Sequence, residues 1–537
     1  MSGTAPDRTR IMTLRPVPNV TPLPSLVRSQ ARDKIKTIDE LADIAAKARA
    51  AGRSVVLAHG VFDLVHLGHV RHLEAAAREG DILIVTCTAD EHVNKGPDRP
   101  VFHDQIRAEM LAAMECIDWA GISFFPTAEQ VIEIIKPDAY VKGQDYADSD
   151  EDVTGGIDLE RQTVEAHGGK VVFTEDITFS SSSLINEHFA RFDPEVQSYL
   201  DEKRNENLLD LALAAVDKIA DLKVLVVGDA IIDEYQYTVP MGKSAKENII
   251  ASRFDGREVF AGGVVAAANH LSSFCKQVEV LTCLGRRDSY ESLIRESLNE
   301  NVSASFVYRR GVPTTRKCRF VDPGHMRKLF EVYHFDDTPL SGHSESEFCK
   351  LIEEQAPKYD VVIVTDFGHG LMTRKAIDKV TSKAKFLAVN AQSNSANHGF
   401  NLITKYKEAD YISIDAPEAR LATGDQFSDL GVLIEDDLRR HIDCRNFAVT
   451  HGENGSVVYE PGKGVSRVPA FTRQVVDTVG AGDAFLAITA PIIASGVPME
   501  IAGFIGNAVG ALKVGIVGHR QSVGKVPLVK FLTALLK

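Results

Sequence analysis

Short apolar runs alternate with helical stretches along most of this 537-residue chain, and this alternation constrains the fold more than any other feature. Strands that alternate with helices form parallel sheets whose two faces are covered by the helices. The alternation starts near Ser54, stops near Phe189 and starts again near Val224. We therefore expect an α/β protein with two doubly wound domains. The predicted strands include residues 55–58, 82–85, 122–125, 140–141 and 170–173 in the first domain, and 224–229, 361–364, 386–389 and 447–449 in the second.

The length of the chain and the break in the alternation predict the domain boundaries. A chain of 537 residues is too long for one core. We predict a flexible, proline-rich tail over residues 1–30, a first domain over 31–190, a helical linker over 191–222 and a second domain over 223–537. Apolar spacing over residues 35–51 predicts a helix before the first strand, with Thr37 or Asp39 as its cap.

Composition and charge exclude several classes of protein. A net charge of -15 disfavours nucleic acid as a partner, because an acidic surface repels phosphate backbones. No apolar stretch reaches the roughly 18 residues that span a bilayer, so we expect no membrane partner. The seven cysteines form no C-x-x-C pair, which favours buried thiols in a reducing compartment over disulfides or zinc. These features together predict a cytoplasmic protein.

A first phosphate site is predicted where the first strand of the N-terminal domain ends. His66 and His69 stand three residues apart at the start of a helix, so both imidazoles lie on one face. The helix N-terminus favours anions, and Gly68 allows a nucleotide to approach closely. Donors would therefore converge on an α-phosphate that gains charge as pyrophosphate is displaced. Taken alone, such a histidine pair could also be a polar pair or a metal site.

The segment from about residue 35 to 188 resembles the cytidylyltransferase-like nucleotidyltransferases. This resemblance implies that Lys95 and Arg107 neutralise a nucleoside triphosphate, although either alone could be a surface charge. It also implies that three serines, in place of the family's threonines, hold the phosphates. The residues implied to bind nucleotide are Gly60, Phe62, Asp63, Gly68, Lys142, Ser180, Ser181 and Ser182, with His66, His69, Lys95 and Arg107 as catalytic residues.

A second phosphate site is predicted at residues 477–485. Gly480, Ala481 and Gly482 present backbone amides at a helix start, which suits the oxygens of a γ-phosphate in transfer. Asp483 follows directly and is placed to accept the proton of the attacking hydroxyl. An ordinary glycine turn with a capping aspartate is the alternative interpretation.

From about residue 224 to its end the chain resembles the ribokinase-like sugar kinases. The resemblance implies that sugar hydroxyls contact Asp229, Asp233, Gly262, Gly263 and Asn269, and that ATP contacts Thr450, Gly452, Gly480, Ala481, Gly482 and Asn507. It places Asp415 and Glu418 near Mg²⁺. Two departures affect the sugar contacts: alanines stand at 266 and 267 where the family has asparagine, with Asn269 a few positions late, and residues 390–393 read N-A-Q-S.

The same resemblance implies a small β-lid built from residues 234–260 and 313–336, through which two subunits form a homodimer. A basic set in the lid could clamp a substrate phosphate or be a solvated strand pair. It consists of Arg316, Lys317, Arg319, Arg327 and Lys328.

Both halves are most similar to the bifunctional enzymes of ADP-heptose synthesis, with the domain order reversed. This implies that the C-terminal domain uses ATP to phosphorylate the anomeric hydroxyl of a sugar phosphate, with heptose 7-phosphate favoured. The N-terminal domain would then transfer a nucleotidyl group, from ATP by preference, to a sugar 1-phosphate. The alternatives are a CTP-dependent transferase with a kinase for another sugar or polyol phosphate, or one catalytically silent domain.

Overall fold

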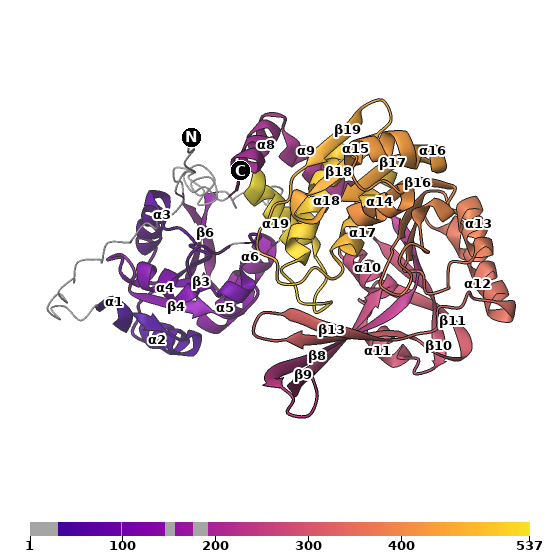
Figure 1. Ribbon diagram of the computed structural model, residues 1–537. Coiled ribbons are helices and arrows are strands. Elements are labelled where there is room, and N and C mark those ends of the chain that lie inside the picture. Colours follow the sequence, from indigo (N-terminus) through magenta and orange to yellow (C-terminus); the bar gives the residue numbers. More distant parts are fainter. Residues whose placement is uncertain (1–29, 98, 145–155, 175–191) are drawn as a thin grey trace, which may run out of the picture. The chain divides into compact units, whose positions relative to one another are not determined.

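The computed structural model describes residues 30–97, 99–144, 156–174 and 192–537, which form two compact units (Figure 1). The first unit contains the described residues of Met1–Glu91, His103–Ser149 and Gly156–Ile177, and the second contains the remaining described residues. Among the described residues, no helix combines the length and the apolar character that crossing a bilayer requires.

The first unit is built on a six-stranded sheet in which every pair of neighbours is parallel. Its strand order is β1-β4-β3-β2-β5-β6. Val56 of β2 packs in one apolar cluster and Leu57 in another, so both faces of the sheet are buried, as is usual for parallel sheets. The elements are α1 (Gln30–Asp33), β1 (Ile35–Lys36), α2 (Ile38–Ala50), β2 (Val55–Gly60), α3 (Leu67–Ala77), β3 (Ile82–Thr88), η1 (Asp90–His92), α4 (Asp104–Ala112), β4 (Trp119–Ser123), α5 (Ala128–Ile135), β5 (Ala139–Gly143), α6 (Gly156–Ala166) and β6 (Lys170–Thr174).

The strand order of the first unit reverses at β2. The chain passes from β2 through β3 to β4 on one side, and then returns to β5 on the other side of β2. Ligands of doubly wound sheets bind at the carboxyl ends of strands at such a reversal. The loop after β2, which leads to His66, therefore lies where a ligand is expected.

The second unit is built on a nine-stranded sheet of order β11-β10-β7-β14-β15-β16-β17-β18-β19. The strands from β11 to β17 are parallel, while β18 and β19 are antiparallel to their neighbours. The strands are β7 (Lys223–Gly228), β10 (Gln277–Arg287), β11 (Val302–Pro313), β14 (Val361–Asp366), β15 (Leu387–Ala391), β16 (Glu408–Asp415), β17 (Asp443–Thr450), β18 (Ser456–Glu460) and β19 (Gly464–Val468).

Helices cover both faces of this large sheet. Val224 of β7 shares an apolar cluster with residues of α9, α10, α17, α18 and α19, whereas Leu225 shares another with residues of α12, α13, α14 and η5. The helical elements are α8 (Pro194–Asn205), α9 (Leu208–Lys218), α10 (Val264–Leu271), α11 (Glu291–Ser297), α12 (Gly342–Gln355), η3 (Ala356–Lys358), α13 (Arg374–Lys383), η4 (Ile403–Lys405), α14 (Ala416–Thr423), α15 (Leu430–Val432), η5 (Leu433–Leu438), α16 (Arg439–His441), η6 (Gly452–Asn454), α17 (Ala481–Ala494), α18 (Met499–Lys513) and α19 (Lys525–Leu536).

A separate four-stranded sheet of order β13-β12-β8-β9 forms the lid that the sequence predicts (Figure 1). Its strands are β8 (Ala230–Lys243), β9 (Ile250–Gly263), β12 (Thr315–Asp322) and β13 (Arg327–His334). Only Asp229 separates β7 from β8, and only Thr314 separates β11 from β12. Gly263, the last residue of β9, directly precedes α10. The chain therefore enters or leaves the lid through single residues at these three points, while residues 335–341 form a longer fourth connection from β13 to α12.

Three segments differ from the sequence predictions. Residues 35–36 form a strand rather than the first turn of a helix, and Thr37 then caps α2 in a capping box with Glu40. β4 begins at Trp119, earlier than predicted. The segment before β7 forms two helices instead of one, because Asn207 adopts a left-handed conformation with φ 58°. Both helices pack on the core of the second unit through residues that include Leu200 and Leu208.

Candidate active sites

In the first unit, Phe62 shapes the loop that follows β2. Its backbone has φ 50°, and its ring packs edge-on against His69 with the ring centroids 5.4 Å apart. A Cβ at Gly60 would lie 3.3 Å from this ring. Gly60 therefore makes room for Phe62, and Phe62 in turn orients His69.

The two predicted catalytic histidines cap α3. His66 Nδ1 accepts a hydrogen bond from the Gly68 N–H at 3.1 Å, while His69 Nδ1 accepts one from the His66 N–H at 3.4 Å. Burial lowers the pKa of His66, which favours its neutral form. Because Nδ1 is the acceptor, the proton of the neutral ring lies on Nε2. His66 Nε2 is buried without a hydrogen-bond partner among the described residues, so it can donate to a phosphate oxygen.

The cations predicted around this site have protein partners. Arg107 is fully buried, donates to the Val61 carbonyl at 2.6 Å and pairs with Asp90 at 2.6 Å, so it braces the loop after β2. Lys142 pairs with Glu160 at 2.8 Å. Asp63 is fully buried. Lys95 belongs to the segment His92–Phe102, which groups with the second unit. Ser180, Ser181 and Ser182 lie outside the described residues, so their predicted contacts stay predictions.

In the second unit, Asp483 lies in the first turn of α17, directly after the glycine turn. Its side chain is only 5% exposed, and Gln392 Nε2 donates to Oδ1 at 3.0 Å. Burial raises the pKa of Asp483 to about 6, which makes it a stronger base than an exposed aspartate. Gln392 belongs to the N-A-Q-S segment, so this departure from the family pattern lies against the predicted base.

The glycine turn leaves the N-terminus of α17 accessible. Gly480 adopts φ 76° as the N-cap, and a Cβ there would lie 2.7 Å from His519 Cε1. A Cβ at Gly482 would meet no atom within 4 Å. The first N–H groups of a helix lack intrahelical acceptors, so this end of α17 can bind phosphate oxygens.

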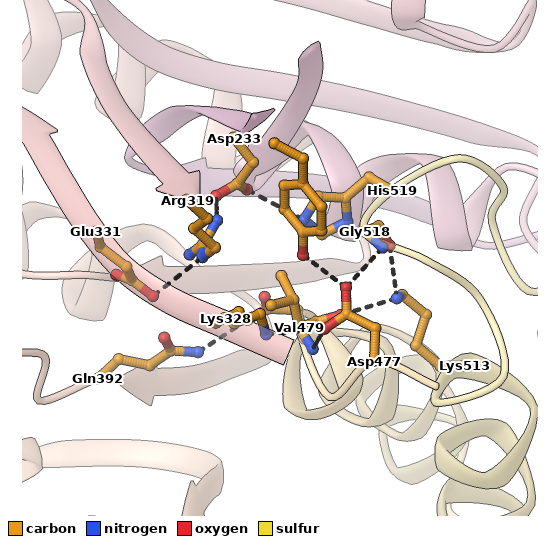
Figure 2. Close-up of polar contacts among 12 residues, drawn as sticks. Asp233, Arg319, Lys328, Glu331, Gln392, Asp477, Val479, Lys513, Gly518 and His519 are labelled. Carbon is orange, nitrogen blue, oxygen red and sulfur yellow. Dashed lines mark hydrogen bonds and ion pairs between the residues drawn. The ribbon is translucent and has the colours of Figure 1, made fainter. Parts of the chain in front are cut away.

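Lys513 and Asp477 hold the glycine turn in place (Figure 2). Lys513 is fully buried, and its Nζ donates to the carbonyls of Val479 and Gly518, each at 2.8 Å. Asp477 accepts hydrogen bonds from four groups on separate segments. These donors are Tyr235 Oη at 2.6 Å, Lys328 Nζ at 2.9 Å, Val479 N at 3.2 Å and Gly518 N at 2.8 Å. One carboxylate thus connects the lid strands β8 and β13 with the turn.

Asp233, predicted to bind sugar, is already bound by protein side chains. It pairs with Arg319 and, at 3.2 Å, with His519 Nε2 (Figure 2). The charge of Arg319 and the hydrogen bond of His519 keep the pKa of Asp233 well below its usual range, although burial acts to raise it. Gly262 has no room for a side chain, because the Asp233 carboxylate occupies that space. Asp233 and Gly262 therefore act together in fixing the lid over the glycine turn.

Asp229 lies at the carboxyl end of β7. It accepts a hydrogen bond from the Phe367 N–H at 2.9 Å, and burial together with the nearby charge of Asp366 raises the pKa of Asp229 to about 7. Gly263, with φ 58°, packs against its carbonyl. Asp229 lines a small cavity together with Arg309, Thr314, Asp336 and His369.

Other predicted contacts serve local structure. Asn269 donates to the Ser297 carbonyl at 2.7 Å, and Asn507 donates to the Val468 carbonyl at 2.8 Å. Thr450 ends β17, and Gly452, with φ 53°, opens η6. The structure brings Asp229, Asp233, Gly262, Gly263 and the glycine turn together. The side-chain amides of Asn269 and Asn507 instead donate hydrogen bonds to backbone carbonyls.

Asp415 and Glu418, the predicted magnesium ligands, form a capping box at the start of α14. The Glu418 N–H donates to Asp415 at 2.8 Å, and the Asp415 N–H donates to Glu418 at 2.9 Å. Burial raises the pKa of both carboxyls, and the charge of Asp415 adds to the effect on Glu418. The part of the chain that the structure describes contains no group of three or more His, Cys, Asp or Glu side chains that could hold a metal.

The basic set of the lid lies on the strand pair β12 and β13, and two of its five cations, Lys317 and Arg319, are buried. Arg316 pairs with Glu234 at 2.9 Å, Arg319 with Asp233 and Lys328 with Asp477, whereas Arg327 is exposed. Lys317 is buried on the same face as Arg319. Solvation is therefore wrong for Lys317 and Arg319, and the phosphate clamp stays a prediction.

Sequence reasoning missed several residues around the glycine turn. Asp477 was part of the motif but had no predicted role, and Gln392 was noted only as a departure. Lys513 has a signal in the sequence, since it is a lone cation directly after the uncharged stretch 501–512. His519 and His369 have no such signal, because only the fold brings them to the site.

Each of the two units contains a match to a known protein family. Residues 221–524 match the pfkB family carbohydrate kinases, and residues 57–188 match the cytidylyltransferase-like family. Because the first match covers more than half of the chain, the protein belongs to the pfkB family of carbohydrate kinases. The transferase-like domain precedes the kinase domain.

Several of the similar relatives are named as bifunctional proteins. The bifunctional protein HldE of Citrifermentans bemidjiense is 42% identical over 156 residues, which is 29% of this chain and 31% of that protein. HldE of Trichlorobacter lovleyi is 38% identical over 165 residues, 30% of this chain and 32% of that protein. The chain thus spans about a third of the length of these relatives. A putative ribokinase from Agrobacterium tumefaciens aligns with a TM-score of 0.47 at 18% identity, over 59% of this chain and 99% of that one.

Proposed function

We propose that the protein is a bifunctional enzyme of nucleotide-sugar synthesis. The C-terminal domain phosphorylates the anomeric hydroxyl of a sugar phosphate with ATP, and the N-terminal domain joins a nucleotidyl group to a sugar 1-phosphate. The observation that carries the proposal is the buried Asp483 directly behind an open helix N-terminus. The two family matches and the similarity to HldE support it.

In the kinase step, the anomeric hydroxyl attacks the γ-phosphorus of ATP and its proton passes to Asp483. A carboxyl with a pKa of about 6 is deprotonated at neutral pH and is still basic enough to take that proton. Gln392 holds the carboxylate through Oδ1. The amides of Ala481 and Gly482 stabilise the charge on the γ-phosphate oxygens, and ADP leaves.

In the nucleotidyl step, an oxygen of the sugar 1-phosphate attacks the α-phosphorus of a nucleoside triphosphate and pyrophosphate leaves. His66 donates from Nε2 to an α-phosphate oxygen, and His69 lies beside it with the ring centroids 4.0 Å apart. If the first substrate is heptose 7-phosphate, a separate phosphatase must remove the distal phosphate between the two steps.

Mg²⁺ is the proposed metal of the kinase domain. Hydrated Mg²⁺ needs only one or two carboxylates, and Asp415 and Glu418 supply two side by side, of which Glu418 is buried and Asp415 is exposed. Their raised pKa values indicate that a neighbouring cation would stabilise the charged pair. When bound with ATP, the ion would neutralise charge on the phosphates.

Heptose 7-phosphate and ATP are the substrates we favour, on the strength of the resemblance to the ADP-heptose enzymes. The alternative is a CTP-dependent transferase with a kinase for another sugar or polyol phosphate. The cytidylyltransferase-like match is the observation that supports this alternative. Pyrophosphate release with ATP or CTP, measured with the same sugar 1-phosphate, separates the two.

We also propose a homodimer formed through the lid, and the cytosol as compartment. Phe330 and Val332 of β13 are exposed and alternate with Glu331, which pairs with Arg319 on the inner face. The outer face of the lid therefore carries an exposed apolar patch. The seven cysteines are free thiols, which supports a reducing compartment.

The kinase assignment is tested with Asp483→Asn in the full-length protein. Sugar-phosphate-dependent ADP formation should fall by about 100- to 10,000-fold, because that is the usual contribution of a general base. Pyrophosphate release by the N-terminal domain should be unchanged and serves as the internal control. Unchanged ADP formation with every sugar phosphate that the wild-type protein accepts would refute the assignment.

A further inference from the structure

Lys317 of β12 carries a buried ammonium that has no ion-pair or hydrogen-bond partner among the described residues. It is 6% exposed, and its Nζ lies 5.3 Å from the ring centroid of Tyr333 and 5.8 Å from that of Phe367. Arg319, two residues on, pairs with Asp233, so Lys317 lies on the inner face of the lid. Aromatic faces hold a cation but do not neutralise it.

His369 is a second buried group without partners. It follows β14, is 4% exposed, and neither ring nitrogen has a hydrogen-bond partner among the described residues. Burial and the charge of Lys317 lower the pKa of His369 to about 3, so the ring is neutral. A neutral imidazole has one N–H donor and one acceptor, and leaving either of them buried without a partner is unfavourable.

The carboxylates around these two groups are already occupied. Asp233 pairs with Arg319 and His519, and Asp366 pairs with Lys405 and accepts a hydrogen bond from Tyr406 at 2.6 Å. The pKa of Asp229 lies near 7, so this carboxyl is partly protonated at neutral pH. Glu331 also pairs with Arg319. An anion that enters beside Lys317 can therefore contact its ammonium directly, because no described carboxylate pairs with it.

We propose that Lys317 and His369 form a subsite for the phosphate that the sugar substrate already carries, on the inner face of the lid beside Asp229. The subsite rests on the proposed kinase function and makes a phosphorylated sugar, rather than a free sugar, its substrate class. The phosphate oxygens supply the counter-ion of Lys317 and accept the N–H of His369. Asp229, in the cavity that His369 also lines, is left for a sugar hydroxyl.

Binding of inorganic phosphate tests the subsite without any sugar. The full-length protein is titrated with inorganic phosphate at constant ionic strength, and the ring signals of His369 are followed by NMR after assignment with His369→Asn. Lys317→Gln should weaken binding about 10- to 100-fold, because a charge-assisted hydrogen bond is lost. Arg327→Gln removes an exposed cation from the same strand pair and should bind as the wild-type protein does. Equal affinity of Lys317→Gln and wild type, with both folded by thermal melting, overturns the proposal.

Kinase kinetics test which phosphate occupies the subsite. Lys317→Gln should raise KM for a sugar phosphate about 10- to 100-fold and leave KM for ATP unchanged, while activity on the dephosphorylated sugar stays as low as in the wild type. If Lys317 bound the transferring phosphate of ATP instead, kcat would fall equally with both acceptors, which overturns the proposal. If the wild-type protein phosphorylates no acceptor, the proposed kinase function fails, and the phosphate titration still decides about the subsite.

Discussion

Burial makes the Asp483 carboxylate more basic, and the buried ammonium of Lys513 opposes this increase in its pKa. Burial raises the pKa of Asp483 to about 6, whereas the charges of His519 and Lys513 act to lower it. Because the base must be deprotonated to accept a proton, kcat/KM of the kinase reaction should rise with pH up to about 6 and then level off. Rates measured from pH 5 to 8 at saturating ATP check this.

Lys513→Met should move that rising limb of kcat/KM to higher pH, because loss of the ammonium leaves the Asp483 carboxylate less stabilised. Lys513→Arg keeps the charge and should leave the limb near that of the wild type. A limb that stays in place in a folded Lys513→Met protein would contradict the electrostatic role of Lys513.

The two ring nitrogens of His66 have different roles, because Nδ1 caps α3 and Nε2 is proposed to donate to phosphate. A substitution that replaces only one of them can therefore test each role by itself. Asparagine is a good N-cap and can replace Nδ1 as the acceptor of the Gly68 N–H, but it has no equivalent of Nε2. His66→Asn should therefore keep the melting temperature and slow pyrophosphate release about 100- to 1,000-fold. His66→Ala, which also removes the cap, should lose in addition about 1 kcal/mol of stability. Full nucleotidyl activity in His66→Asn would refute the role of Nε2.

Among the elements, α8 and α9 belong to the core of the kinase unit. Leu200, Leu208, Ala212 and Val216 are buried in the same cluster as residues of α17 and α19. A fully buried leucine or valine contributes roughly 1.5–3 kcal/mol, and a whole domain is stable by only about 5–15 kcal/mol. A protein of residues 192–537 should fold and melt cooperatively, whereas one of residues 223–537 should not. Equal melting temperatures of the two proteins would refute this assignment.

The sequence predicts elements best where local patterns determine them. β2, β3, β7 and β14 are continuous apolar runs and were predicted close to their actual positions, because strands buried on both faces need such runs. The charged strands of the lid have no such pattern, so their position came from resemblance alone. The phosphate motifs were likewise visible as local sequence. The contacts of Asp477 join residues up to 242 positions apart, which no local pattern reveals.

At the scale of the whole molecule, the outer face of the lid should determine the oligomeric state. Phe330 is 56% exposed and stacks on Phe320 with ring centroids 4.3 Å apart. Phe330→Glu should convert a dimer into a monomer in size-exclusion chromatography with light scattering, because a charge would be buried in an apolar interface. Phe427→Glu, at a phenylalanine outside the lid that is 93% exposed, is the matched control. A monomeric wild-type protein, or a dimeric Phe330→Glu variant, would contradict the proposed dimer.

The single-residue connections of the lid have a mechanical consequence. Asp229, Gly263 and Thr314 are three of the four points at which the chain enters or leaves the lid, and residues 335–341 between β13 and α12 are the fourth. Any rotation of the lid must therefore be absorbed by torsion angles at or next to these segments. Two of these three residues are proposed sugar contacts. β8 alone extends from this axis for 14 residues, roughly 45 Å at about 3.3 Å per residue. A sugar bound at Asp229 therefore contacts the lid close to its rotation axis. A small rotation of the lid at this point displaces the far end of β8 by a large distance.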